Sequence, residues 1–518
     1  MKPIRLFLIN AIIMTTTSLL LGGAGVWYNI YLTNKIGSEA MGIFHLLMSI
    51  YGFGITVAIS GIGFAITRLV SEEIGKNPRA NMYPIVRKCT IYALVFGSLS
   101  GIALFCFAPV IATQIIGNYQ IVLAIRVMAI GLPFIAFSTV LNGYFTAVRR
   151  ISKSCISQLL DQFITILLTI IGLSFFLKGG LDSICLAIAA SGAVAETLTL
   201  CISYFLYTHD LRKINGLDKP SPSIAYKMLG IALPVAFSSY LRSGLVSFRN
   251  LIVPASLKKH GVSSEQALSV FGIIHGLVMP VITFPAAFLN SFASLIIPEL
   301  AQMRAKQPDV KSNDRINSAV SRMFQVSFLF AIAVSGILLF FSNQISAVVC
   351  KSTDVSLYIR LFAPIVPFMY VDNVIDGMLK GLDLQINSMR YNIIDAAVTL
   401  ALVYRLLPIY GIIGYVFVLY VSEILNFGLS LGCLVKSTCF NLSISNKIIK
   451  PVLCIVAAST LIHFVIPWLS IHSPNITLAS AIILTILLFV WFLYLTGCLD
   501  AEDTRFFKNI FRFSSKTD

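Results

Sequence analysis

Two arginines lie seven residues apart in a long apolar stretch that begins near Tyr226. Because seven residues make about two helical turns, Arg242 and Arg249 should share one face of a helix. A guanidinium group binds phosphate or pyrophosphate in bidentate fashion, so the pair could hold an anionic group of a substrate. The alternative is that each arginine pairs with a carboxylate of a neighbouring helix. The sequence leaves both interpretations open.

Acidic side chains form a second group within apolar sequence. Asp372 and Asp376 lie one helical turn apart, with Asn373 between them. Together with Asp395 and Glu423 they could bind a proton or a sodium ion, because carboxylates inside a membrane often mark the path of a coupling ion. The alternative, which we favour, is a hydrogen-bonded network that fixes the C-terminal half of the chain.

The composition indicates membrane-spanning helices as the elements that carry these residues. Of 518 residues, 57% are hydrophobic and 12% are charged. A bilayer core about 30 Å thick needs roughly 20 apolar residues per helix, and runs of that length recur along the chain. We expect an all-α polytopic membrane protein with about fourteen spans. They begin near Leu6, Met41, Ile85, Ile121, Cys155, Asp182, Tyr226, Ala267, Ala319, Ser356, Asn392, Tyr410, Pro451 and Asn475. The first is expected to be an uncleaved span.

An internal repeat relates the two halves of the chain. A set of six residues recurs 234 positions later, from 133 to 367 and onward. Its members are Pro133, Phe134, Gly143, Ser154, Asp161 and Thr165, matched by Pro367, Phe368, Gly377, Ser388, Asp395 and Thr399. Glu196 likewise has a counterpart in Glu423, and with Asp161 it joins the candidate ion-coupling or polar network. Proline, glycine and acids are constrained inside a membrane, so their joint recurrence carries weight.

The repeat predicts how the chain is divided. Six spans, an even number, separate the copies, so both halves should enter the membrane in the same direction. We expect two parallel-repeat six-helix lobes at residues 1–215 and 216–440. Two additional transmembrane helices and a basic cytoplasmic tail occupy residues 441–518.

Glycine and proline interrupt two corresponding spans. The second contains Gly61, and the eighth contains Gly272, Gly276, Pro280 and Pro285. Such residues bend or locally unwind membrane helices, which makes them candidate hinges or gates. Their general abundance in membrane helices is the alternative explanation.

The basic residues indicate the orientation. The net charge is +16, and most of the 38 Lys and Arg residues fall in connectors on the side of the two termini. Basic connectors stay cytoplasmic, so we expect a multi-pass protein of the cytoplasmic membrane with both termini in the cytoplasm. This distribution suits contact with membrane lipids and argues against binding of nucleic acid.

Motifs for metals, cofactors or catalysis are lacking in the sequence. Ten cysteines show no CxxC spacing, six histidines form no ligand set, and no GxxxxGK[ST] loop occurs. We therefore expect no metal, no cofactor and no enzymatic activity, with transport driven by an ion gradient or by the gradient of the substrate.

Several segments resemble a known family. They are YLTNKIGSEAMG at 31–42, RLVSEE at 68–73, ALPVAF at 232–237 and PELA at 298–301. The resemblance is to the stage V sporulation protein B family of the multidrug/oligosaccharidyl-lipid/polysaccharide (MOP) exporter superfamily. It implies two six-helix lobes, alternating access and similarity to MurJ-type lipid II flippases. Those flippases carry functional arginines in their first span, whereas residues 6–32 here contain no Lys or Arg. Arg242 must therefore carry more of any anion binding.

The leading hypothesis is a flippase that moves an undecaprenyl-pyrophosphate-linked saccharide, here a peptidoglycan precursor destined for the spore cortex, across the cytoplasmic membrane. Proton or sodium coupling and a monomeric state are expected. The alternatives are a cation-coupled multidrug exporter of the same superfamily and a membrane scaffold that transports nothing.

Overall fold

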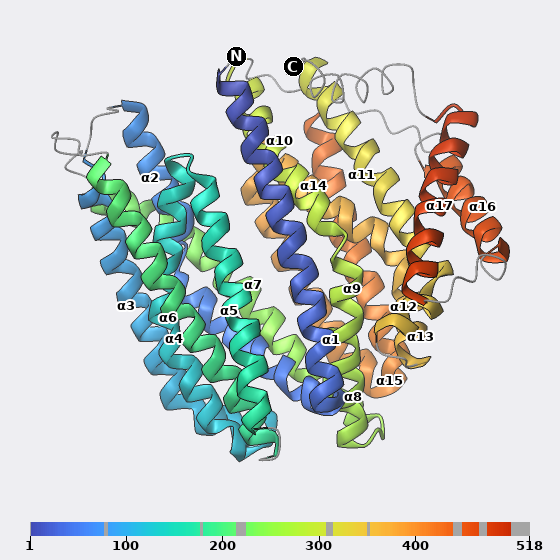
Figure 1. The fold of residues 1–518 in the computed structure, drawn as a ribbon, viewed down its shortest axis with the longest axis horizontal. Coiled ribbons are helices and arrows are strands. Elements are labelled where there is room, and N and C mark those ends of the chain that lie inside the picture. The colour runs from blue at the N-terminus through green and yellow to red at the C-terminus, as the bar shows by residue number, and fades with distance from the viewer. Residues whose placement is uncertain are drawn as a thin grey trace. The chain divides into compact units, whose positions relative to one another are not determined.

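The structure is a computed structural model that describes residues 2–76, 81–176, 180–213, 224–306, 314–349, 353–438, 448–465 and 474–498. These residues are almost entirely helical, and no strand occurs among them (Figure 1). Eleven helices of the described part are long and apolar enough to cross a membrane. The predicted all-α polytopic membrane fold is confirmed.

Two very long helices each contain two predicted spans. Helix α1 (Lys2–Ile59) is broken at Gly37, where φ is 85° and ψ is 166°. Helix α15 (Gln385–Ser437) is broken at Gly411, where φ is 57° and ψ is −133°. These positions favour glycine, because a residue with a side chain would be strained at such positive φ values. All fourteen predicted starting points fall in described helices, but the count of fourteen stays a prediction.

The remaining helices follow the predicted spans closely. In chain order they are α2 (Ile62–Lys76), α3 (Tyr83–Val110), η1 (Ile111–Ile116), η2 (Tyr119–Ile121), α4 (Val122–Ala147), α5 (Ile151–Phe176), α6 (Leu181–Lys213), α7 (Ile224–Lys259), α8 (Ser264–Ile273), η4 (Ile274–Val278), α9 (Met279–Thr283), α10 (Ala286–Lys306), α11 (Asp314–Phe340), α12 (Ser342–Val349), α13 (Thr353–Phe362), η5 (Ala363–Ile365), α14 (Val366–Gly381), α16 (Lys450–Val465) and α17 (Pro474–Leu495).

Contacts divide the structure into two compact units. Unit 1 comprises Met1–Ser291 and Met389–Ser422, and unit 2 comprises Phe292–Ser388 and Glu423–Asp518. The predicted boundaries at 215/216 and 440/441 both lie outside the described residues, as does the basic tail from 499 onward. The division into two lobes and a C-terminal pair therefore stays a prediction.

Unit 1 packs around the bundle of α3, α4, α5 and α6, with α1 against it (Figure 1). Small residues bring α3 and α4 together. A methyl group added at Gly97 would lie 2.9 Å from Pro133 Cα, and one at Gly101 would lie 2.8 Å from the carbonyl oxygen of Ala129. Lipid supplies no hydrophobic force between helices, so this close van der Waals packing holds the bundle together.

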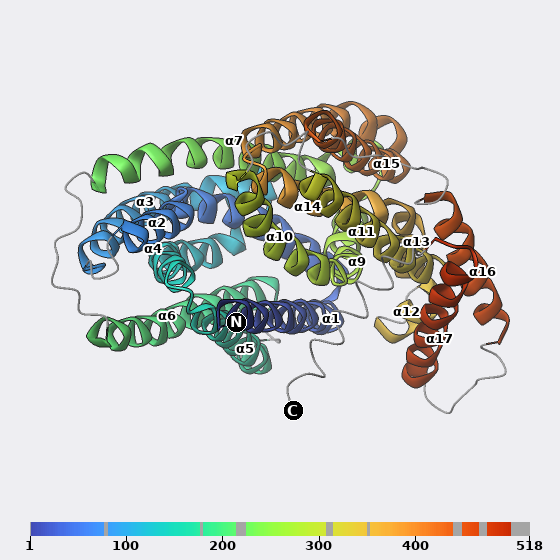
Figure 2. The ribbon, with the colours of Figure 1, turned by 90° about the horizontal axis from the view of Figure 1, so that it is seen from above.

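Unit 2 is built on α11, which packs against α14 and α16. Helices α16 and α17 lie side by side (Figures 1 and 2). Gly381 of α14 lets α10 approach, because an added methyl group would lie 3.0 Å from the carbonyl oxygen of Ile297. The ends of α11, α13 and α16 frame a cavity that is described below.

Candidate functional site

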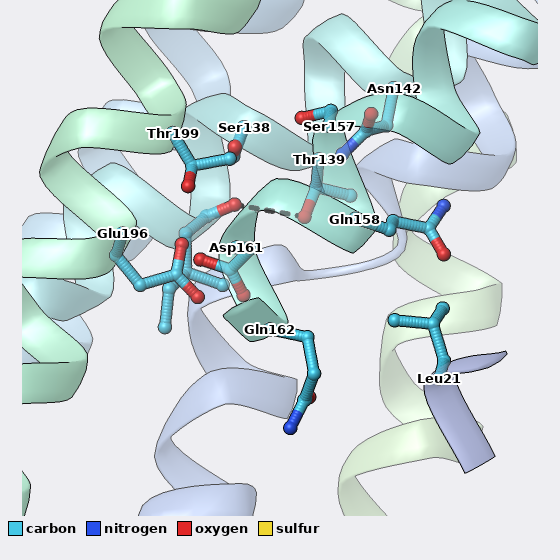
Figure 3. A pocket seen from close by; sticks show the side chains of 11 residues that line it. Leu21, Ser138, Thr139, Asn142, Ser157, Gln158, Asp161, Gln162, Glu196 and Thr199 are labelled. Carbon is cyan, nitrogen blue, oxygen red and sulfur yellow. Dashed lines mark hydrogen bonds between the residues drawn. The ribbon is translucent and has the colours of Figure 1, made fainter. Parts of the chain in front are cut away.

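A polar cavity of about 290 Å³ lies inside unit 1 (Figure 3). Helix α5 contributes Asp161 and Gln158, and α6 contributes Glu196. Helix α4 contributes Ser138 and Asn142. The structure thus brings together Asp161 and Glu196, which the sequence placed in one candidate network. The α4 residues were missed, because short polar side chains in an apolar helix give no signal of their own.

The two acids of this cavity belong to one electrostatic group. Asp161 and Glu196 interact electrostatically with each other, and the Tyr51 phenol of α1 interacts with both. The buried Asp161 Oδ1 has no hydrogen-bond partner among the described residues. Carboxylate, hydroxyl and amide oxygens are the ligands that hard cations prefer, and a carboxylate can also take up a proton. The cavity therefore has the chemistry of a site for a small cation.

Helix α7 packs against the second half of α1 through one face and carries its two arginines on another face. Several hydrogen bonds join α7 to this segment, among them Tyr240 Oη to Ser60 Oγ just after the end of α1 at 2.6 Å, Thr56 Oγ1 to Ser243 Oγ at 3.0 Å and Ser247 Oγ to the Ser49 carbonyl at 2.7 Å. The residues of α7 that make these bonds recur every three to four positions and thus share one face. Arg242 and Arg249 lie together on a different face, as their spacing predicted.

That second face of α7 lies along the first half of α15. Ser238 Oγ lies 3.4 Å from Met389 Sδ, and His260 Nδ1 lies 3.2 Å from the Pro408 carbonyl oxygen. These contacts show that the two segments run in the same direction. With a rise of about 1.5 Å per residue from the Ser238 level, Arg242 lies about 6 Å along, Asp395 about 9 Å and Arg249 about 16 Å.

Asp395 is therefore level with the gap between the two arginines, and it interacts electrostatically with both. Arg242 is exposed and has no hydrogen bond or ion pair within 4 Å among the described residues. Arg249 is half-buried, and its Nε and Nη2 donate to Asn250 Oδ1 at 3.4 Å. The arrangement lies between the two predicted alternatives: a single carboxylate faces two guanidinium groups without a close ion pair to Arg242.

The acidic residues of the C-terminal half make hydrogen bonds. In unit 2, Asp372 is buried and its Oδ2 accepts from Asn426 Nδ2 at 2.7 Å. Asp376 accepts from Ser388 Oγ and from Lys380 Nζ. Asn373 is exposed. These contacts are those of a polar network, and a role of the pair in ion coupling stays a prediction.

The other two members of the predicted network lie in α15. In unit 1, Asp395 Oδ1 accepts from Ser422 Oγ at 2.7 Å and from Thr399 Oγ1 at 3.2 Å. Glu423 is the residue after Ser422 in the chain and belongs to unit 2. Asp395 and Glu423 thus fall in different units, and a common network of the four acids stays a prediction.

The internal repeat is visible in a specific contact. Ser154 Oγ donates to Asn142 Oδ1 at 3.2 Å, and 234 positions later Ser388 Oγ donates to Asp376 Oδ1. At the same shift of 234 positions, Ser138 is matched by Asp372. The acidic pair of the C-terminal half therefore occupies the positions of Ser138 and Asn142, which line the cavity of unit 1. The sequence analysis missed this match because it compared identical residues, and here the residue types differ.

The chain bends where the sequence predicted interruptions. Between α1 and α2, Ser60 and Gly61 both have positive φ, at 47° and 70°. In the corresponding stretch η4 is a π-helix that ends before Pro280, and the helix breaks again at Pro285, between α9 and α10. A π-helix widens the hydrogen-bonding pattern, and proline removes a donor. Whether these points open and close during transport stays a prediction.

Gly272 and Gly276 have a second role in packing. A methyl group at Gly272 would lie 2.6 Å from the backbone nitrogen of Gly42, and one at Gly276 would lie 2.7 Å from Met41 Cγ. Both glycines thus let α8 and η4 approach α1 more closely than any side chain would allow.

A half-buried pair of histidines adjoins Arg249, and the sequence analysis missed it. His275 Nε2 lies 2.8 Å from Tyr415 Oη, and its ring centroid lies 6.4 Å from that of His45. Arg249 interacts electrostatically with His275 and Tyr415. Two histidines about 230 positions apart form no motif. Within the part of the chain that the structure describes, no group of three or more His, Cys, Asp or Glu residues is arranged to hold a metal ion.

Comparison with known proteins agrees with this architecture. Residues 7–304 match the family described as polysaccharide biosynthesis protein. Stage V sporulation protein B of Bacillus subtilis (strain 168) is 23% identical over 424 residues, which cover 79% of each chain. The lipid II flippase MurJ of the same organism is 21% identical over 331 residues, 60% of each chain.

Among solved structures, the fold is similar to that of an inward-facing multidrug resistance MATE family transporter of the MOP superfamily. The TM-score is 0.62 at 15% sequence identity, and the match covers 82% of this chain and 97% of the transporter. The chain therefore belongs to the polysaccharide biosynthesis protein family, and it is similar in sequence to stage V sporulation protein B and in fold to the MATE transporter.

Proposed function

We propose that this protein is a flippase that moves an undecaprenyl-pyrophosphate-linked saccharide from the inner to the outer leaflet of the cytoplasmic membrane by alternating access. Arg242 is the observation that carries the proposal. It is an exposed guanidinium group within a membrane span, without a hydrogen bond or close ion pair among the described residues. A charge inside a membrane is costly unless it faces a partner or a watery cavity, so a transient anionic partner explains its presence.

Other basic residues of unit 1 contrast with Arg242. Arg150 and Lys153 both form ion pairs with Asp210, whose side chain is only 1% exposed. Each of these cations thus has a close anionic partner within the protein, as structural charges near a membrane usually do. Arg242 interacts electrostatically with Asp395 but has no hydrogen bond or close ion pair among the described residues, which leaves its five N–H donors available for a phosphate.

The relatives support the class of substrate. One is named a lipid II flippase, and the matched family is described as polysaccharide biosynthesis protein. A lipid-linked saccharide combines a pyrophosphate with a sugar and a prenyl chain, and a guanidinium group binds the pyrophosphate in bidentate fashion. We expect a peptidoglycan precursor as the cargo and the spore cortex as its destination, in line with the sporulation protein that the chain resembles.

Asp395 gives the site a way to release its cargo. When the site is empty, this carboxylate partly offsets the charge of both arginines. An arriving pyrophosphate competes with the carboxylate for the same guanidinium groups. Binding is thereby kept weak enough for release, as transport requires.

Coupling to an ion gradient is assigned to the cavity of unit 1. Asp161 and Glu196 would take up a proton or a sodium ion there, with Ser138 and Asn142 as further oxygen ligands. The cavity and the arginine face share α1 as a neighbour, since Tyr51 interacts with both acids and Ser49 hydrogen-bonds to α7. Uptake of a cation could therefore bias the position of α7 through α1.

The test is translocation of a fluorescent undecaprenyl-pyrophosphate-linked saccharide in proteoliposomes. Arg242→Ala should lower the rate about 10- to 100-fold, as expected when a charged hydrogen-bonding pair worth about 1.5–3 kcal/mol is lost. Arg242→Lys should restore only part of the rate, because an ammonium group cannot bind in bidentate fashion. Arg405→Ala, which also removes an exposed arginine from a span, is the control and should keep the wild-type rate. Near-normal translocation by correctly inserted Arg242→Ala would refute the assignment.

A cation-coupled drug exporter is the competing proposal, and the acidic cavity is the observation that favours it. An exporter of that kind would extrude cationic dyes from cells, and this activity would depend on Asp161 and Glu196 but not on Arg242. A non-transporting scaffold would respond in neither assay. The flippase predicts translocation of the lipid-linked saccharide, loss of gradient dependence in Asp161→Asn, and no dye efflux.

A further inference from the structure

A second cavity lies in unit 2 and is distinct from the carboxylate cavity in both chemistry and position. Its volume is about 410 Å³. It is lined by Leu339 and Phe340 of α11, Arg360 of α13, and Thr460, His463 and Phe464 of α16.

The lining residues come from helix ends that we expect on the outer face of the membrane. Phe340 is the last residue of α11, and His463 lies in the last turn of α16. Both helices follow connectors that are rich in basic residues, around Lys311 and Lys447. Because basic connectors stay cytoplasmic, the far ends of these helices should reach the outer leaflet.

The cavity carries positive charge with no carboxylate in its lining. Arg360 Nε donates to Ser342 Oγ at 3.3 Å, and its Nη2 donates to Asn343 Oδ1 at 3.4 Å. Both acceptors are neutral, so the guanidinium group is oriented without an ion pair among the described residues. His463 also lines the cavity and is exposed. Its ring lies edge-on to the ring of Phe464, with 6.4 Å between the ring centroids.

Three of the remaining lining residues are apolar, and Thr460 adds a hydroxyl group. Leu339, Phe340 and Phe464 offer hydrocarbon surface next to Arg360, and the Phe464 side chain is 72% exposed. A small inorganic anion would use the arginine but not this surface. An anionic amphiphile uses both, because its phosphate meets the guanidinium group while its chain lies against the aromatic and aliphatic side chains.

We propose that this cavity binds the phosphate group of a lipid in the outer leaflet, with the lipid chain against Leu339, Phe340 and Phe464. Arg360 is the main phosphate ligand, held in place by Ser342 and Asn343, and His463 is an additional donor. Basic pockets between membrane helices recognise lipid head groups in this way. The proposal is independent of the role assigned to Arg242, since it uses other helices and other residues.

Two lipids could supply this chemistry: a phospholipid such as phosphatidylglycerol and a prenyl phosphate such as undecaprenyl phosphate. The test measures binding of each probe to the purified full-length protein by native mass spectrometry. Phosphatidylglycerol, undecaprenyl phosphate and inorganic phosphate are titrated separately. Arg360→Ala should weaken binding of at least one lipid by tenfold or more, and Arg360→Lys should weaken it less.

Matched variants separate the site from general effects. Phe464→Ala should weaken lipid binding while the protein stays monodisperse. Arg405→Ala should leave binding of both lipids unchanged. Loss confined to undecaprenyl phosphate supports the prenyl carrier as the ligand, and loss that includes phosphatidylglycerol supports a bulk phospholipid. Equal lipid binding by wild type and Arg360→Ala, or displacement of the lipids by millimolar inorganic phosphate, would overturn the proposal.

Discussion

A methyl group at Gly272 has no space in the structure. It would lie 2.6 Å from the backbone nitrogen of Gly42 and 3.1 Å from its Cα, and these are backbone atoms of α1 that cannot rotate away. Helix α8 would have to move off α1, and the hydrogen bond between Ser38 Oγ and Ser269 Oγ at 2.6 Å would be stretched with it. Gly272→Ala therefore probes the contact between the two helices directly.

The magnitude follows from two opposing effects. Inserting a methyl group into a packed contact costs typically about 1–3 kcal/mol. Replacing glycine by alanine within a helix gains about 0.5–1 kcal/mol when the site is open. Gly52 of α1 is such a site, since an added methyl group would meet no atom within 4 Å. Gly52→Ala should thus stabilise the protein, and the two variants should differ by about 1.5–4 kcal/mol.

Thermal unfolding of the purified proteins in detergent measures this difference. The expected order of midpoints is Gly52→Ala above or equal to wild type, with Gly272→Ala clearly below. If Gly272→Ala were as stable as wild type but slower in transport, the glycine would act as a hinge and not as a packing residue. That result would refute the packing argument and support the role that the sequence suggested for this position.

Three further outcomes are expected. Ser388→Ala should destabilise the protein by about 1.5–3 kcal/mol, because its hydroxyl donates to a carboxylate, whereas Ser154→Ala, which loses a bond to a neutral amide, should cost about 0.5–1.5 kcal/mol; denaturant titration of both variants checks the difference. Asp395→Asn should strengthen binding of a soluble pyrophosphate probe by about 0.5–1 kcal/mol, measured by calorimetry, because the arginines lose a competing charge. Tyr415→Phe should cost about 1–3 kcal/mol by leaving the buried His275 nitrogen without its partner, visible as a lower unfolding midpoint.

The class of fold was predictable because a bilayer imposes simple rules. A helix must satisfy its own backbone in lipid, so apolar length alone locates the spans. The sequence did not show that the two helices on either side of Gly37 follow each other with only a kink between them, nor that the same holds at Gly411. The sequence does not distinguish a glycine in a connector from a glycine at which a helix changes direction. The two differ in their backbone φ angle, which is set by the packing of neighbouring helices.

The candidate site was predictable along each helix but not between helices. Spacing placed Arg242 and Arg249 on one face, because helical periodicity is a local property. Their neighbour Asp395 lies about 150 positions away, and only the contacts at the two ends of α7 place it level with the arginines. The pairing of His275 with Tyr415 is equally distant in sequence and was missed for the same reason.

The repeat also changes what the acidic pair of α14 can mean for substrate choice. Asn142 of one half is matched by Asp376 of the other, and Thr146 is matched by Lys380 at the same shift. An amide and a hydroxyl in the first half thus correspond to an ion pair of 2.5 Å in the second, so neither half gains net charge at these two positions. The charge that differs between the halves lies at the other match, where Ser138 is replaced by the buried Asp372. If the halves differ in cation binding, the difference should therefore follow Asp372 and not Asp376, which is already neutralised by its neighbour one turn away.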